Sequence, residues 1–110
     1  MTSKYHIAVT TCPTLEIATQ LANDVIEQQL AACVNIIPAI KSVYKWKGKI
    51  EHDNESLLII KTMKQQLASL EKLLLKLHPY ETPEFISMPI ESGSKAYLDW
   101  ITTSLEKKTV

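Results

Sequence analysis

The side chains best able to do chemistry in this 110-residue chain gather in one short segment, residues 78–84, which reads HPYETPE. The segment holds an imidazole, a phenol and two carboxylates. Proline disfavours helical conformation in the residue before it, so His78 and Thr82 are both expected outside a helix. We expect a stiff connector that places these groups at the C-terminus of a helix over 64–77, because sites often lie on loops of a rigid scaffold. The alternative is a proline-rich helix stop whose polar side chains have no role.

Composition and charge exclude several classes of function. The 12 basic residues balance the 12 acidic ones, and every basic residue is lysine. Arginine supplies the fork that binds phosphates and guanine edges, so we expect no nucleic-acid partner. Gly48 and Gly93 are too few and too far apart for a phosphate-binding glycine loop. The chain shows no signal-peptide pattern and no membrane-spanning run, and two cysteines make no disulfide framework, so we expect a cytoplasmic protein with reduced thiols.

The hydrophobic pattern predicts one α+β domain over residues 1–110. Alternating and helical spacings give, in order, a strand over 5–10, a helix over 15–30 capped by Thr14, strands over 32–46 and 50–62, a helix over 64–77, a strand over 85–90 and a helix capped by Ser94. The order β-α-β-β-α-β with right-handed crossovers predicts a ferredoxin-like sandwich with an added C-terminal helix. Pro38 cannot donate to a strand ladder, which predicts an edge, a bulge or a bend.

The hairpin whose tip is Lys47-Gly48-Lys49 is unusually long. Each of its strands has about a dozen residues, or roughly 40 Å at about 3.3 Å per residue, about twice what a small sandwich needs. Residues 40–55 should therefore project from the domain, carrying Tyr44 and Trp46. Large rings stabilise a protein when they are buried, so we expect them to be buried on a neighbouring subunit of a homo-oligomer.

Several separated segments closely resemble the CutA family of divalent-cation tolerance proteins. They are AACVNI at 31–36, YKWKGK at 44–49, residues 55–62, HPYETPE at 78–84 and YLDW at 97–100, and the resemblance runs from about Tyr5 to Leu105. It implies a ferredoxin-like fold similar to that of the PII signalling proteins, and a homotrimer whose hairpins reach across subunits. It also implies a link to tolerance of copper and other divalent cations, with no established catalytic activity.

The family's copper-site pattern places a cysteine at the end of the first strand and two consecutive histidines before Pro-Tyr. This chain has Cys12 and His78, but Leu77 stands where the first histidine would be, and leucine cannot ligate. A thiolate and an imidazole are reasonable ligands for copper, especially Cu(I), if carboxylates, water or another subunit complete the site. The alternative is a small strand-end cysteine and an imidazolium favoured by the helix dipole. Cys33 is expected to be a small buried hydrophobe.

The resemblance also implies a cleft between subunits that gathers polar residues, here Glu55, Lys61, Tyr80, Glu81 and Glu84. A partly desolvated lysine beside a carboxylate could hold a small anion or nucleotide, and the alternative is a structural ion pair across the interface. Trp46 is expected to pack the trimer or the core, with ligand stacking in this cleft as its second role. His6 and His52 lie in polar stretches and are expected to be solvated.

These residues leave four functions open. The first is a trimeric divalent-cation tolerance protein that binds copper or another divalent metal and acts in the metal-ion response. The second is a PII-like signalling module that binds a small ligand between subunits. The third is an enzyme using His78 with Glu81 or Glu84 as acid and base, but no nucleophile–base–orienter set is recognisable, so we expect no enzyme. The fourth is a stable platform for a protein partner.

Overall fold

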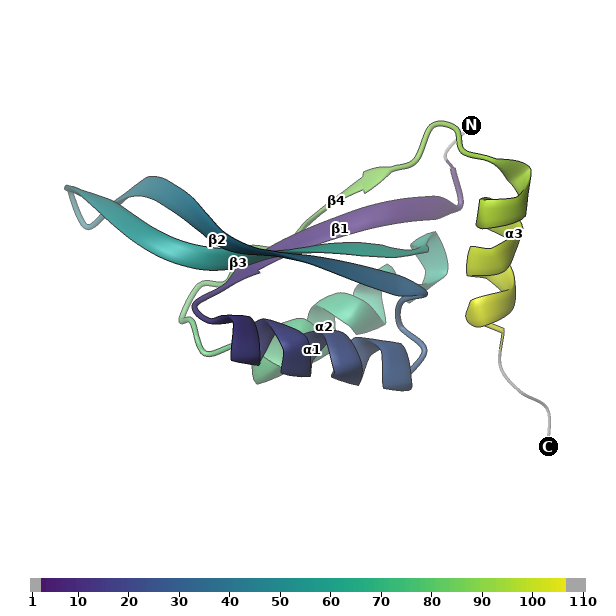
Figure 1. Ribbon diagram of the computed structural model, residues 1–110, viewed down its shortest axis with the longest axis horizontal. Helices are drawn as coiled ribbons and strands as arrows, with labels where there is room; N and C mark the ends of the chain where they lie inside the picture. Colours follow the sequence, from purple (N-terminus) through teal and green to yellow (C-terminus); the bar gives the residue numbers. More distant parts are fainter. Residues whose placement is uncertain (1–2, 107–110) are drawn as a thin grey trace.

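Four strands form one antiparallel sheet with two helices on one of its faces (Figure 1). The structure, a computed structural model, describes residues 3–106. Its elements are β1 (Tyr5–Cys12), α1 (Leu15–Glu27), β2 (Cys33–Trp46), β3 (Lys49–Met63), the 3₁₀ turn η1 (Lys64–Gln66), α2 (Leu67–Leu77), β4 (Ile86–Pro89) and α3 (Lys95–Ser104). The strand order β2-β3-β1-β4, with every neighbouring pair antiparallel, confirms the predicted ferredoxin-like α+β fold.

Local signals place the helix ends. The Thr14 hydroxyl accepts from the Ile17 amide at 3.1 Å, and the Ser94 hydroxyl accepts from the Tyr97 amide at 3.3 Å, so both predicted N-caps are confirmed. His78 is the C-cap of α2, with extended backbone angles, because Pro79 follows it. The first long helix stops at Glu27 rather than at 30, and Gln29 just beyond it has a φ of 57°.

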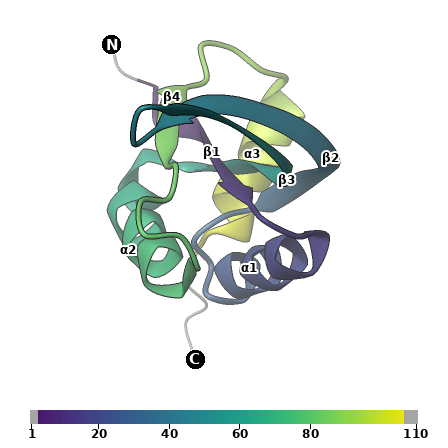
Figure 2. The same ribbon diagram turned by 90° about the vertical axis from the view of Figure 1, so that its left-hand side faces the viewer.

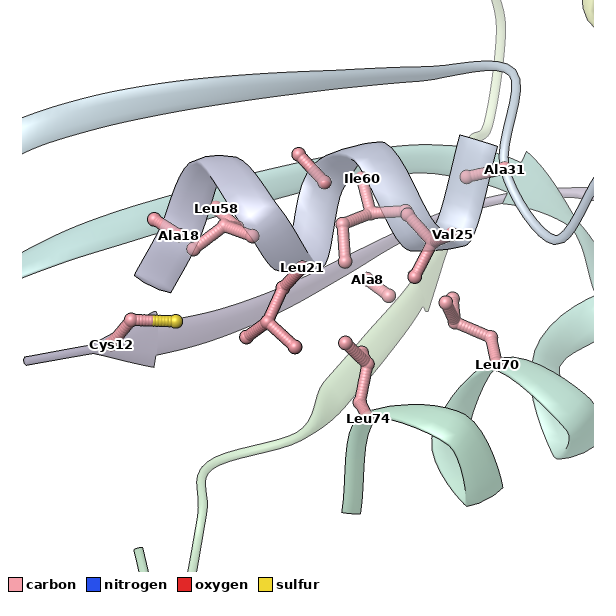
Figure 3. Close-up of a cluster of buried hydrophobic side chains, with 11 residues drawn as sticks. Ala8, Cys12, Ala18, Leu21, Val25, Ala31, Leu58, Ile60, Leu70 and Leu74 are labelled. Atoms are coloured by element: carbon pink, nitrogen blue, oxygen red, sulfur yellow. The ribbon is translucent and has the colours of Figure 1, made fainter. Parts of the chain in front are cut away.

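The core lies between the sheet and the pair α1 and α2, which run side by side beneath it (Figure 2). Leu58 and Ile60 from β3 are fully buried there, together with Val25 of α1 and Leu70 of α2 (Figure 3). β3 pairs with β1 on one side and β2 on the other, so its apolar residues 57–60 lie in a central strand.

The opposite face of the sheet is apolar but uncovered by α1 and α2. Side chains alternate between faces along a strand, so this face carries Ile7 and Val9 of β1 and their β4 partners Met88 and Ile86. Ile86 and Met88 are 54% and 45% exposed. The terminal helix α3 lies at one end of the sheet, where Ile101 packs against Tyr5 and Met63 (Figure 1).

The β2–β3 hairpin projects from the sandwich, as predicted (Figure 1). β1 pairs with β3 only from Ser56 to Met63, so the part of β3 before Ser56 pairs with β2 alone. The register shifts between Ile37 and Ile40, and Ala39 has a φ of 59°, so Pro38 lies at a bulge in an edge strand, two of the three alternatives predicted for it. No helix within residues 3–106 is long and apolar enough to cross a lipid bilayer.

Candidate functional site

The end of β1 and the end of α2 bring Cys12 and His78 together. The Cys12 Sγ lies 4.0 Å from the His78 Nε2, although the two residues are 66 positions apart. Both side chains are buried, and Cys12 sits at one end of the core cluster (Figure 3). The fold therefore places a thiol and an imidazole side by side at the junction where the sequence predicted a metal pair.

Hydrogen bonds define the protonation state of this pair. The His78 Nε2 lies 2.7 Å from the Thr11 carbonyl oxygen, and the His78 Nδ1 accepts from the Tyr80 amide at 3.2 Å. Only the neutral tautomer with its proton on Nε2 satisfies both bonds. Burial, and after it the nearby Glu55 carboxylate, raises the pKa of Cys12 to about 11. A metal ion at this pair must therefore displace the thiol proton and change the imidazole tautomer.

A third ligand is not in place beside the pair. The described residues contain no group of three or more histidine, cysteine, aspartate or glutamate side chains arranged to hold a metal ion. Leu77 is 42% exposed and borders a separate shallow hollow with Ile17 and Pro79. Leu77, at the position where the resemblance implied a histidine, thus leaves an apolar surface.

A second site lies where the projecting hairpin leaves the sheet, and we call it the hairpin-base pocket. Its cavity has a volume of about 590 Å³. It is lined by Thr11, Ser42, Val43, Tyr44, Trp46, Asp53, Glu55, Tyr80, Glu81, Thr82 and Glu84. Trp46, Glu55, Tyr80, Glu81 and Glu84, which the sequence grouped in one cleft, are therefore assembled within a single chain.

The pocket is acidic, and its phenols orient its carboxylates. Four of its lining residues are acidic and none is basic. The Tyr80 hydroxyl donates to the Glu55 Oε2 at 2.8 Å, and the Tyr44 hydroxyl donates to Asp53. Burial and then the bond to Glu55 raise the pKa of Tyr80, and the bond to Asp53 raises the pKa of Tyr44 to about 12. The His78 ring packs 4.8 Å from the Tyr80 ring, which joins the pocket to the thiol–imidazole pair.

Lys61, the sixth residue grouped in that cleft, lies elsewhere in the chain. It is six positions along β3 from Glu55, which is roughly 20 Å at about 3.3 Å per residue. Its Nζ donates to the Asn35 side-chain oxygen and lies 3.8 Å from the Cys33 Sγ. Within one chain, Lys61 and Glu55 therefore do not form the predicted anion site, and the four carboxylates of the pocket repel an anion. The predicted cleft between subunits stays a prediction.

The structure also shows the burial of His6, His52 and Cys33. His6 is buried rather than solvated, because it lies on the face of β1 that the helices cover, and its Nε2 lies 3.2 Å from the Ser3 carbonyl oxygen. His52 is exposed, as predicted. Cys33 is half-buried rather than fully buried.

The sequence reasoning did not assign Tyr44 and Asp53 to the site. Counting residues back from the hairpin tip gives the observed pairs Ser42 with Asp53 and Tyr44 with Glu51. That register puts Tyr44 and Asp53 diagonally opposite on one face of the ribbon, so it was the signal that could have found them.

The fold and the two sites define a class: a ferredoxin-like α+β protein with a projecting hairpin over an acidic pocket and a buried thiol–imidazole pair. Residues 6–104 match the family described as CutA1 divalent ion tolerance protein, and the chain belongs to this family. The predicted membership is thereby confirmed.

Individual relatives support membership of the same family. The chain is 40% identical over 96 residues to the divalent-cation tolerance protein CutA of Thermus thermophilus, covering 87% of this chain and 93% of that protein. It is 47% identical over 94 residues to protein CutA of Mus musculus, covering 86% of this chain. The chain spans about half the length of the mouse and human relatives, 53% and 52%.

Solved structures give the same result. The crystal structure of CutA1 from Oryza sativa superposes with a TM-score of 0.92 at 41% identity, covering 97% of this chain and 98% of that one. The structure of CutA from Xylella fastidiosa gives 0.92 at 36% identity, covering 94% and 100%.

Proposed function

We propose that this chain is a homotrimeric divalent-cation tolerance protein of the cytoplasm that binds copper through Cys12 and His78 and acts in the metal-ion response by binding rather than by catalysis. The observation that carries the metal site is the 4.0 Å separation between the Cys12 Sγ and the His78 Nε2. With bonds of about 2.3 Å to the thiolate sulfur and about 2.0 Å to the imidazole nitrogen, the sulfur–ion–nitrogen angle at a bridging ion would be roughly 140°. This wide angle suits a low-coordinate ion better than a tetrahedral one.

The ligand types favour copper as Cu(I). Thiolates select soft ions, and a low-coordinate site tolerates Leu77 in place of a histidine. Because the pKa of Cys12 is about 11, binding near neutral pH releases the thiol proton. The affinity for the ion should therefore rise by up to tenfold per pH unit below pH 11. The imidazole proton must move from Nε2 to Nδ1, so the Tyr80 amide must leave Nδ1.

The proposed trimer is supported by the uncovered sheet face and by the hairpin. Exposed Ile37, Ile86 and Met88 extend the apolar surface of that face. An apolar surface of this kind is typical of an interface between subunits. Light scattering after gel filtration should give three times the 12.4 kDa chain mass, and Met88→Lys should lower it. A monomeric mass for the unaltered chain at micromolar concentration would contradict the trimer.

The metal proposal is tested by calorimetric titration of Cu(I), under anaerobic reducing conditions, and of Cu(II). Cys12→Ser and His78→Ala should each weaken Cu(I) binding strongly. Matched controls are Cys33→Ser, which alters the other cysteine, and His52→Ala, which alters an exposed histidine. Binding that survives both site changes, or that is lost in Cys33→Ser, would show that copper does not use this pair.

A further inference from the structure

Tyr80 is held at two points, once by its backbone and once by its side chain. Its amide donates to the His78 Nδ1 at 3.2 Å, and its hydroxyl donates to the Glu55 Oε2 at 2.8 Å. Its ring centroid lies 4.8 Å from that of the His78 ring. Glu55 immediately precedes Ser56, where the pairing of β3 with β1 ends, so it marks the base of the projecting hairpin. One residue therefore links the imidazole of the proposed copper pair to the hairpin.

Hydrogen bonds fix the tautomer of the His78 ring. The bond from the Tyr80 amide needs a lone pair on Nδ1, and the 2.7 Å bond to the Thr11 carbonyl oxygen needs the proton on Nε2. An ion that bonds Nε2 needs the lone pair there, so the ring proton must lie on Nδ1. The Nδ1–H group and the Tyr80 N–H group would then face each other as two donors. One of the two groups must turn away.

The amide is freer to move than the ring. Only 8% of the surface of His78 is exposed, and an ion shared with Cys12 would hold the ring in place. Tyr80, in contrast, lies in residues 78–85, which belong to no helix or strand. Because the φ of Pro79 is fixed by its ring, the amide turns through the ψ of Pro79, and that rotation also carries the Tyr80 side chain. The bond from the Tyr80 hydroxyl to Glu55 is therefore disturbed when the amide leaves Nδ1.

We infer that Tyr80 couples copper binding to the hairpin: an ion on the Cys12–His78 pair releases Tyr80 from Glu55, and the bond to Glu55 in turn opposes binding of the ion. This inference rests on the proposed copper function and names how that site is regulated. Because coupling between two sites is reciprocal, any contact that strengthens the bond between Tyr80 and Glu55 lowers the affinity for copper. The coupled groups belong to one chain, so packing of the hairpin on a neighbouring subunit leaves the coupling in place.

Tyr80→Phe tests the coupling, because it keeps the ring and the amide and removes only the hydroxyl bond. Loss of a hydrogen bond to a charged group should tighten Cu(I) binding by about tenfold in anaerobic calorimetry. Damage to the fold would weaken binding, so tighter binding separates coupling from a merely structural role. The matched control is Tyr5→Phe, which removes another tyrosine hydroxyl bond, the 2.6 Å bond with Thr102, and should leave the affinity unchanged. Unchanged or weaker binding in Tyr80→Phe, or equal tightening in Tyr5→Phe, would overturn this inference alone if binding still needs Cys12 and His78.

Nuclear magnetic resonance of the unaltered protein carries the test if Tyr80→Phe does not fold. Cu(I) is diamagnetic, so the signals of nearby groups stay visible during a titration. We expect the Tyr80 amide signal and the Trp46 indole signal to shift until the site is saturated, because the two residues line one pocket. The Trp100 indole, on α3, should keep its position and serves as the internal control. A Tyr80 amide or a Trp46 indole that stays unshifted in copper-saturated protein would overturn the coupling. Copper binding that is absent, or that does not need the Cys12–His78 pair, would overturn the proposed function and this inference together.

Discussion

His78 is predicted to hold the 78–84 connector to the sandwich. Its ring makes two hydrogen bonds, one with the Thr11 carbonyl and one with the Tyr80 amide, and packs against the Tyr80 ring. His78→Ala removes all three contacts. Each lost hydrogen bond contributes about 0.5–1.5 kcal/mol, and the ring contact a similar amount. The free energy of unfolding should therefore fall by roughly 2–4 kcal/mol.

Urea denaturation followed by circular dichroism measures this loss. With a slope of about 2 kcal/mol per M, the midpoint should move by roughly 1–2 M. The protein concentration must be held fixed, because an oligomer gains stability with concentration. His52→Ala removes an exposed histidine and should stay within about 0.5 kcal/mol of the unaltered protein. If His78→Ala denatures at the same midpoint as His52→Ala, the contacts of His78 do not hold the connector.

Three further predictions concern the core, the hairpin tip and the buried thiol. Ile60→Ala should lower the free energy of unfolding, measured by urea denaturation, by about 2–5 kcal/mol because the side chain is fully buried. Ile50→Ala, on the same strand but 70% exposed, should lower it by under about 0.5 kcal/mol. Equal losses would contradict the burial argument. Gly48→Ala should lower the free energy of unfolding by about 1–2 kcal/mol, because a φ of 82° strains a residue that carries a Cβ. The added Cβ meets nothing within 4 Å, so no steric clash adds to this loss. An unchanged urea midpoint would argue against backbone strain at the turn. Because its pKa is raised to about 11, Cys12 should react with iodoacetamide at pH 8 much more slowly than Cys33, and its rate should rise with pH up to about 11. Mass spectrometry of the labelled peptides measures both rates. Labelling of Cys12 before Cys33 would refute this prediction.

Local chemistry explains what the sequence predicted well. Thr14 and Ser94 cap helices because their hydroxyls reach amides three residues on, and Pro79 ends α2 whatever the rest of the fold does. The hairpin tip follows from Gly48, which adopts its φ of 82° readily, and the bulge lies beside Pro38, which has no N–H to donate to a strand ladder. Each of these features depends on residues within a few positions of one another.

Burial of a face and distances between residues depend on tertiary packing, which a strand or helix pattern does not contain. Alternation along β1 shows that two faces differ, but it does not say which one the helices cover, so His6 was placed in solvent although it is buried. Glu55 and Lys61 share a face of β3, yet the rise per residue of an extended strand keeps them apart. The bond between Tyr44 and Asp53 depends on the hairpin register, which is set by the position of the tip.

The sequence by itself determined the order of the elements, their caps and turns, the long hairpin and the membership of the CutA1 family, because these follow from short-range patterns and separated motifs in register. Only the tertiary structure decided that Cys12 meets His78 with both imidazole nitrogens already bonded, and that Glu55 is buried beside the Tyr80 hydroxyl. Those facts depend on how a strand end, a helix end and a hairpin base converge. Burial and hydrogen bonding, which raise the pKa of a thiol or orient a carboxylate, exist only once distant segments have packed together.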